Sequence, residues 1–207
     1  SVELSESLGL AVDTIIVRRN LLCQVYSDLN EMDLALACVT ETRRIAETSP
    51  GVSAEQRFWT MMEYASLLFH LDQTEESAKI FEEAVVFGAA ELPDYEGYRG
   101  ALADLALVYT RLGRFEQAEK MYEQSIAYNN ANKGVDYSNT LVIRDNLGLL
   151  YMQMGRYEDA LSQLNDVLAD RIRIFGDEHS KTYITRSMLG RTMMELGRYE
   201  EAEEQML

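Results

Sequence analysis

A short motif recurs three times in this chain at a constant interval, and this periodicity constrains the fold more than any other feature. The copies are Leu112–Ala118, Met154–Ala160 and Leu196–Ala202, and their glycines are 42 residues apart. Each reads large apolar, glycine, arginine, aromatic, two polar residues and alanine. Two earlier segments keep nearly the same spacing, with Asn30 and Asp72 at the place of the glycine. A repeat of this length predicts a stack of similar supersecondary units.

Two sets of small residues accompany each of these turn positions. The set seven residues before the turn is Cys23, Ala65, Ala106, Gly148 and Gly190. The set five residues after it is Ala35, Ser77, Ala118, Ala160 and Ala202. Small residues on two facing helices allow a close approach, and Asn, Asp and Gly tolerate the left-handed conformation at a helix end. Large apolar residues recur around them at helical spacing. The pattern therefore predicts antiparallel helical hairpins with tight turns.

This pattern of small and large residues resembles the tetratricopeptide repeat, whose usual length is about 34 residues. The extra residues correspond to about one more turn in each helix of the pair. The resemblance implies an all-α fold, an α-solenoid with a right-handed superhelix of about five antiparallel hairpins. The expected repeats are residues 11–47, 53–89, 94–130, 136–174 and 178–207, the last of them truncated. Because each repeat packs on its neighbours, we expect one solenoid domain over residues 1–207.

The segment between repeats narrows the resemblance. Gly176–Thr182 repeats Gly134–Thr140 at the same interval, and both are similar to the inter-repeat segment of kinesin light chains. That segment reads glycine, two residues, histidine, proline, one residue and threonine, and Ser138 and Ser180 stand here at the proline. The resemblance implies a type of repeat, in which His179 caps or packs at the start of a helix.

Composition excludes several classes of function. The formal net charge of −16 argues against a nucleic acid or an anionic membrane as partner. The chain has no apolar run long enough to span a bilayer and no signal peptide, so we expect a cytoplasmic protein. Cys23 and Cys38 are expected to be buried thiols in a reducing compartment. The first residue is not methionine and the last lies within a helical pattern, which predicts a fragment of a longer protein.

The sequence offers no catalytic constellation, and we expect no enzyme. His70 and His179 are the only histidines and lie in different repeats, without a cysteine or second histidine at ligand spacing. The glycines stand at helix turns rather than after strands, so no phosphate-binding loop is indicated. We therefore expect neither a metal nor a cofactor.

In tetratricopeptide arrays the first helix of each hairpin lines a concave groove, so the resemblance also implies where a partner binds. The open positions lie 10, 9, 6, 3 and 2 residues before each turn. The candidate groove residues are Glu63, Phe69, Asp104, Leu107, Arg111, Asp145, Asn146, Leu149, Met152 and Arg191. The alternative for the apolar members is packing against the first helix of the next repeat. Asn146 has an amide that both donates to and accepts from a peptide backbone. The three carboxylates predict a partner with basic residues that flank apolar anchors.

The leading functional hypothesis is therefore a protein–protein interaction scaffold that binds a peptide or protein segment in its groove. The alternative is a ligand-sensing regulatory domain coupled to a DNA-binding or enzymatic output domain outside this chain. A non-catalytic arm of an enzyme is a third possibility, and self-association through the ends of the solenoid is a fourth.

Overall fold

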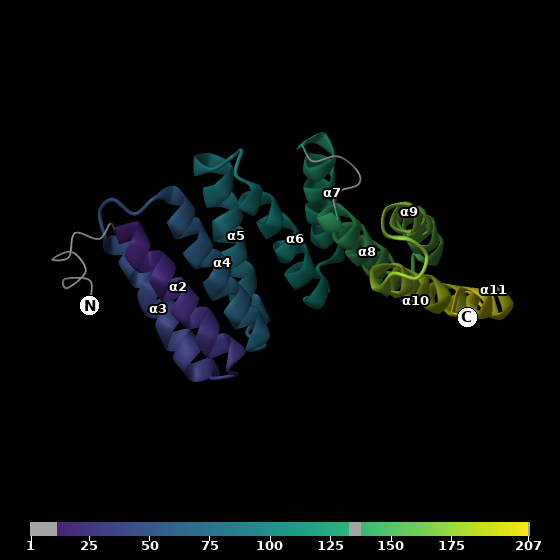
Figure 1. The fold of residues 1–207 in the computed structure, drawn as a ribbon, viewed down its shortest axis with the longest axis horizontal. Coiled ribbons are helices and arrows are strands. Elements are labelled where there is room, and N and C mark those ends of the chain that lie inside the picture. Colours follow the sequence, from purple (N-terminus) through teal and green to yellow (C-terminus); the bar gives the residue numbers. More distant parts are fainter. Residues whose placement is uncertain (1–11, 133–137, 207) are drawn as a thin grey trace. The chain divides into compact units, whose positions relative to one another are not determined.

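The structure is a computed structural model that describes residues 12–132 and 138–206 (Figure 1). These residues form α-helices joined by short connections, and no strand occurs among them. The helices are α2 (Val12–Asp28), α3 (Met32–Thr48), α4 (Ala54–His70), α5 (Thr74–Glu91), α6 (Glu96–Arg111), α7 (Phe115–Asn132), α8 (Ser138–Gln153), α9 (Tyr157–Phe175), α10 (Ser180–Glu195) and α11 (Tyr199–Met206). They belong to two compact units, Ser1–Val108 and Tyr109–Leu207.

Consecutive helices pack as hairpins within each unit. In the first unit α2 packs against α3 and α4 against α5, and α2 also contacts α4. In the second unit α8 packs against α9 and α10 against α11, and α10 also contacts α8 and α9. The predicted all-α architecture of helical hairpins is confirmed. The even-numbered helices are the first helices of their hairpins.

All five predicted turn residues adopt the left-handed conformation. Their φ angles are 60° at Asn30, 63° at Asp72, 71° at Gly113, 72° at Gly155 and 73° at Gly197. In every copy the N–H of the next residue donates to the carbonyl four residues before the turn, which is the Schellman arrangement at a helix end. These hydrogen bonds satisfy carbonyl groups that the helix end leaves without partners. The turn alignment read from the sequence is confirmed in the two degenerate copies as well.

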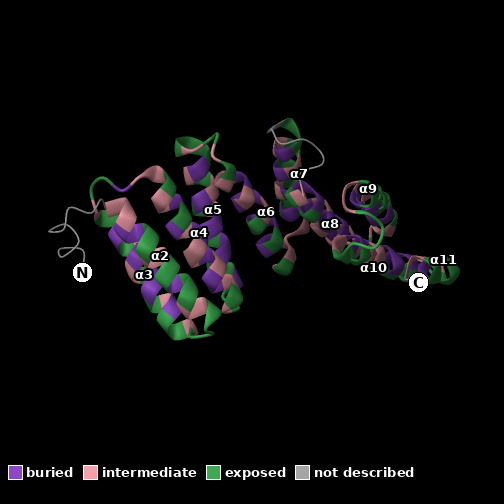
Figure 2. Cartoon of the chain, in the orientation of Figure 1, coloured by how far each residue is buried: buried purple, intermediate pink, exposed green. Residues whose placement is uncertain are grey.

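The small residues that flank the turns are buried in the contact between paired helices. Figure 2 shows that each helix carries both buried and exposed residues. Ala65 and Ala160 have no exposed surface. Ser77 replaces alanine in the second hairpin, and its hydroxyl donates to the carbonyl of Ala65 at 2.8 Å. A hydroxyl is therefore accommodated in this contact because it has a backbone acceptor on the facing helix. Leu22 stands eight residues before its turn and is 46% exposed, whereas the leucines at the same position in the last three repeats are buried.

Two polar side chains cap first helices after a connection. Ser53 precedes α4, and its hydroxyl accepts a hydrogen bond from the N–H of Gln56 at 3.3 Å. His179 precedes α10, where its Nδ1 accepts from the N–H of Lys181 at 3.1 Å and its ring stacks on Phe175. The expected capping role of His179 is confirmed. Its counterpart Tyr137, in the segment from Gly134, lies outside the described residues.

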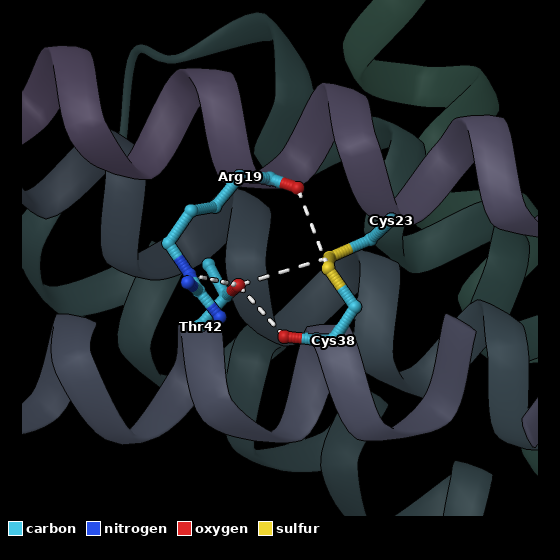
Figure 3. The surroundings of a disulfide bond; sticks show 4 residues. All are labelled: Arg19, Cys23, Cys38 and Thr42. Carbon is cyan, nitrogen blue, oxygen red and sulfur yellow. Dashed lines mark hydrogen bonds between the residues drawn. A yellow bond between two sulfur atoms is a disulfide. The ribbon is translucent and has the colours of Figure 1, made fainter. Parts of the chain in front are cut away.

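The expectation that the cysteines remain thiols is wrong for this structure, which joins Cys23 of α2 to Cys38 of α3 by a disulfide (Figure 3). Both residues are buried at the close contact of the hairpin, and their Cα atoms are 5.4 Å apart. This separation is within the range that a disulfide requires. Thr42 lies beside the bond, with its Oγ1 3.7 Å from Sγ of Cys23 and accepting a hydrogen bond from Nε of Arg19 at 3.0 Å.

The disulfide is expected to protect both cysteines from alkylation. Treatment of the folded and of the denatured chain with iodoacetamide should add no carbamidomethyl group until a reductant is present, after which two groups are added per chain. Intact-mass spectrometry distinguishes these states. Full alkylation of the denatured chain without reductant would show that the cysteines are thiols, as the sequence alone had predicted.

Candidate functional site

In the first unit, two adjoining pockets lie between the first helices α2 and α4. Their positions follow from the hairpin: one side of each first helix is covered by its second helix, which leaves the opposite side open. Gln24 and Glu63 line both pockets, so the pockets form one continuous depression. We refer to this depression as the α2–α4 groove.

The pocket nearer the turns carries acidic side chains and is called the acidic pocket. Its volume is about 200 Å³. The residues that line it are Cys23, Gln24, Ser27, Asp28, Val39, Glu63, Ser66, Leu67 and His70. Of these, Glu63, Ser66 and His70 stand 9, 6 and 2 residues before the turn at Asp72. The helical spacing therefore identified side chains that face this pocket.

The second pocket carries the exposed indole of Trp59 and is called the aromatic pocket. Its volume is about 210 Å³. The residues that line it are Val17, Asn20, Leu21, Gln24, Gln56, Trp59 and Glu63. Val17, Leu21 and Trp59 are 41%, 59% and 42% exposed, which is unusual for large apolar side chains that lie together.

The charges of the groove are negative. Asp28 and Glu63 line the acidic pocket, and among the described residues no lysine or arginine lines either pocket. Burial raises the pKa of Glu63, because removal of water disfavours its charged form. A carboxylate that loses hydration without gaining a cationic neighbour is poised to interact with a cation brought by a ligand.

The other candidate residues of the first unit lie on α4 and α6. Phe69 is half-buried with its ring edge toward His70, and Leu107 is 42% exposed. Asp104 is exposed on α6, and partial loss of hydration raises the pKa of its carboxyl to about 6. Of the four candidate residues in the first unit, Glu63 lines the α2–α4 groove, whereas these three do not.

In the second unit, five of the candidate residues keep surface available for contact. Asn146, Leu149 and Met152 are partly exposed on α8, and Arg191 is exposed on α10. Met194, on the same helix, is 41% exposed. We refer to Asn146, Leu149, Met152, Arg191 and Met194 as the α8–α10 face. Arg111, the last residue of α6, is also exposed.

Asp145 does not belong to this face, and its assignment to the groove is corrected. Its side chain is only 4% exposed and forms an ion pair with Arg171 of α9 at 2.5 Å. Thr185 of α10 donates a further hydrogen bond to Oδ1 of Asp145 at 3.1 Å. In this repeat the position 10 residues before the turn is thus covered by the partner helix and by the next hairpin. Met62, at the same position in the second repeat, is also buried.

Several groove residues of the first unit were missed although the sequence contained the signal. The same register applied to the first repeat selects Asn20, Leu21, Gln24, Ser27 and Asp28, all of which line the groove. Trp59 lies 13 residues before the turn at Asp72, about one helical turn beyond the first of the predicted open positions, which lies 10 residues before the turn. The open face of α4 therefore extends beyond the five positions predicted from helical spacing.

Two further properties concern the chemistry available. Within residues 12–132 and 138–206, no three His, Cys, Asp or Glu side chains come together as a metal site. Over the same ranges, no helix combines the length and the apolar character needed to cross a membrane.

The sequence and the fold of this chain are similar to those of known proteins. The sequence model of the tetratricopeptide repeat family matches residues 56–131, 98–172 and 136–206. No curated protein matches the chain. Similar solved structures include kinesin light chain-like repeats of Podosopora anserina, with a TM-score of 0.85, 20% identity and coverage of 95% of this chain and 93% of that one. BtubC of P. vanneervenii has a TM-score of 0.86 and 18% identity, with coverage of 98% and 81%.

A third similar structure is a signal transduction ATPase with a tetratricopeptide repeat sensor from Pyrococcus horikoshii. Its TM-score is 0.78 at 14% identity, and the match covers 95% of this chain but 30% of that one. At these identities the structures show the fold, and the family model, which covers most of the sequence, shows the family. The chain belongs to the tetratricopeptide repeat family.

Proposed function

We propose that this chain is a non-enzymatic scaffold that binds a peptide or protein segment along the open faces of its first helices. The tetratricopeptide fold is typical of protein–protein interaction, since stacked hairpins create extended binding surfaces. The observation that supports this role most directly is the α2–α4 groove. It is lined mostly by residues at positions that vary between repeats, whereas the residues of the hairpin contact, such as Cys23 at its base, keep their character and are buried.

The chemistry of the open faces favours a partner that carries basic and apolar residues. Asp28 and Glu63 supply negative charge in the first unit, and exposed apolar side chains stand beside them. In the second unit Leu149 and Met152 offer apolar surface and Asn146 an amide able to bind a peptide backbone. The net charge of −16 also speeds the approach of a positively charged partner.

The proposed location is the cytoplasm. The disulfide between Cys23 and Cys38 removes the support that buried thiols gave to a reducing compartment. The alkylation experiment on material taken directly from cells therefore bears on this location as well.

Removal of side chains from the α8–α10 face is expected to weaken binding. We propose to select peptides from a random displayed library on the intact chain and to measure their affinities by calorimetry. For peptides that use this face, Asn146→Ala combined with Leu149→Ala should raise Kd at least about tenfold, because both side chains are partly exposed and neither fills the core. Circular dichroism should show an unchanged helical signal.

The control for this experiment is a pair of exposed residues on the second helix α9. Ser162→Ala combined with Asn165→Ala removes two exposed polar side chains from a surface outside the proposed site. If the selected peptides lose affinity for the α9 variant and keep it for variants of both first-helix faces, the proposed function is contradicted.

A further inference from the structure

The aromatic pocket contains an indole that is both exposed and held in place. Nε1 of Trp59 donates a hydrogen bond to the hydroxyl of Tyr95, in the connection between α5 and α6. The Tyr95 ring in turn packs edge-on against Phe58, which is fully buried, with ring centroids 5.9 Å apart. A large aromatic side chain that is fixed before binding loses little conformational entropy when a ligand covers it. Trp59 therefore has the properties of an anchor for an apolar or cationic side chain.

The acidic pocket next to it lacks a cation of its own. Neither the carboxylate of Asp28 nor that of Glu63 forms an ion pair or a hydrogen bond within the part of the chain that the structure describes. By contrast, other carboxylates of the same unit, such as Glu47 and Glu83, pair with Arg43 on the outside of the hairpins. The groove thus carries the negative charges of Asp28 and Glu63 beside a cavity large enough for a side chain, and no lysine or arginine of the described ranges lines it.

We infer that the α2–α4 groove binds a peptide segment in which lysine or arginine enters the acidic pocket and a neighbouring apolar side chain packs on Trp59. This inference rests on the proposed function and assigns to one site its ligand chemistry. The two pockets share Gln24 and Glu63, so the two ligand side chains must come from adjacent parts of one segment. The aliphatic stem of lysine or arginine also suits this arrangement, since it passes along Leu21 while its charge reaches Glu63.

The same features disfavour other occupants. An acidic peptide or a phosphate would meet Asp28 and Glu63, and no lysine or arginine in the described part of the chain lines either pocket to compensate them. A second copy of this chain would bring a net charge of −16 toward a negative groove. A purely apolar segment would fill the aromatic pocket but leave Glu63 with even less water and no partner, which costs free energy.

The experiment uses peptides selected from a random displayed library on the intact chain. Binding is followed by the fluorescence of Trp59, which is the only tryptophan of the chain. We expect the selected peptides to be enriched in lysine or arginine beside an aliphatic or aromatic residue, and to change the emission of Trp59. Replacement of the basic residue of such a peptide by norleucine should raise Kd at least about tenfold.

Variants of the chain test the two carboxylates. Glu63→Gln and Asp28→Asn keep the size of each side chain, and each should weaken the selected peptide about tenfold or more. Glu55→Gln is the matched control, because Glu55 lies in the first turn of the same helix α4 and lines neither pocket. Charge reversal by Glu63→Lys should shift a fresh selection away from basic peptides.

The outcomes separate this inference from the proposed function. Peptides without an excess of basic residues, or peptides that bind Glu63→Gln and Asp28→Asn normally, overturn the inference. If such peptides still weaken on variants of the α8–α10 face, the proposed function stands without it. A library that yields no peptide for the folded chain overturns both.

Discussion

Replacement of Arg171 by methionine is expected to lower the free energy of unfolding of the second unit by about 3 to 5 kcal/mol, which is the usual consequence of breaking a buried ion pair from one side. The guanidinium of Arg171 and the carboxylate of Asp145 are 2% and 4% exposed and lie 2.5 Å apart. Methionine fills a similar volume but removes the ion-pair partner of a buried carboxylate, which keeps the hydrogen bond from the Thr185 hydroxyl and the weaker electrostatic effect of Arg144. Chemical denaturation followed by circular dichroism measures this loss.

A double variant shows whether the loss comes from the orphaned charge. Asp145→Leu in the Arg171→Met background removes both charges, and we expect it to regain much of the lost stability. Arg173→Met is the matched control on the same helix. Arg173 pairs with Asp170 at 3.1 Å on the exposed side of α9, where an ion pair contributes about 1 kcal/mol or less. Equal losses for Arg171→Met and Arg173→Met would contradict the assignment.

The loss of stability in Arg171→Met is expected to depend on pH, and the pKa of Asp145 determines in which direction. Burial raises the pKa of Asp145 to about 6 from an ordinary value of 3.8, against the opposing effect of Arg171. A raised pKa means that the folded state holds its proton more tightly than the unfolded state. The contribution of Asp145 to stability is therefore greatest at low pH and is lost as the pH rises through about 6. Removal of Arg171 takes away the effect that lowers this pKa, so Arg171→Met should cost more stability at about pH 7 than at about pH 5.

Replacement of Gly148 by leucine is expected to unfold the α8–α9 hairpin, at a cost of about 3 kcal/mol or more. A Cβ atom added at Gly148 would lie 2.8 Å from both Cγ and Cδ2 of Leu164, a side chain with no exposed surface. Rotation about the Cβ–Cγ bond of Leu164 moves Cδ2 but not Cγ, and both residues lie in the contact between two helices. The higher helix propensity of leucine recovers only about 1 kcal/mol.

A second glycine provides the control for this substitution. Gly100 lies in α6, and a Cβ built on it meets no described atom within 4 Å. Gly100→Leu should therefore leave the urea midpoint unchanged or raise it. Leu164→Ala in the Gly148→Leu background should restore part of the stability, because it removes the atoms that clash. A cooperative transition of Gly148→Leu at the wild-type midpoint would show that the hairpin contact is looser than the structure indicates.

The positions of the turns and of the hairpin contact could be predicted from the sequence because they depend on neighbours close in the chain. A glycine, asparagine or aspartate between two helices adopts a left-handed conformation wherever it occurs, and the five φ angles agree. The small residues seven before and five after each turn meet because a short turn leaves two helices little freedom. These features follow from helical spacing and turn geometry alone.

The candidate site was predictable only in part, since exposure depends on a third helix. Spacing identified the face of α4 that forms one side of the groove, and the same register identifies the face of α2 only when it is applied to the first repeat. It also placed Asp145 on an open face. The structure covers Asp145 with Arg171 from its own hairpin and with Thr185 from the next one. The rotation between successive hairpins decides such coverage, and no local pattern encodes that rotation.

The sequence by itself determined the repeat, its turns and the helical hairpins, because each rests on contacts between residues near in the chain. The tertiary structure alone decided that Cys23 meets Cys38 at 5.4 Å between their Cα atoms, that Asp145 is buried, and that Trp59 is fixed beside an acidic pocket. Each of these depends on how two or more packed helices align side chains that are distant in sequence. Packing in three dimensions therefore converts a regular repeat into a surface with individual sites.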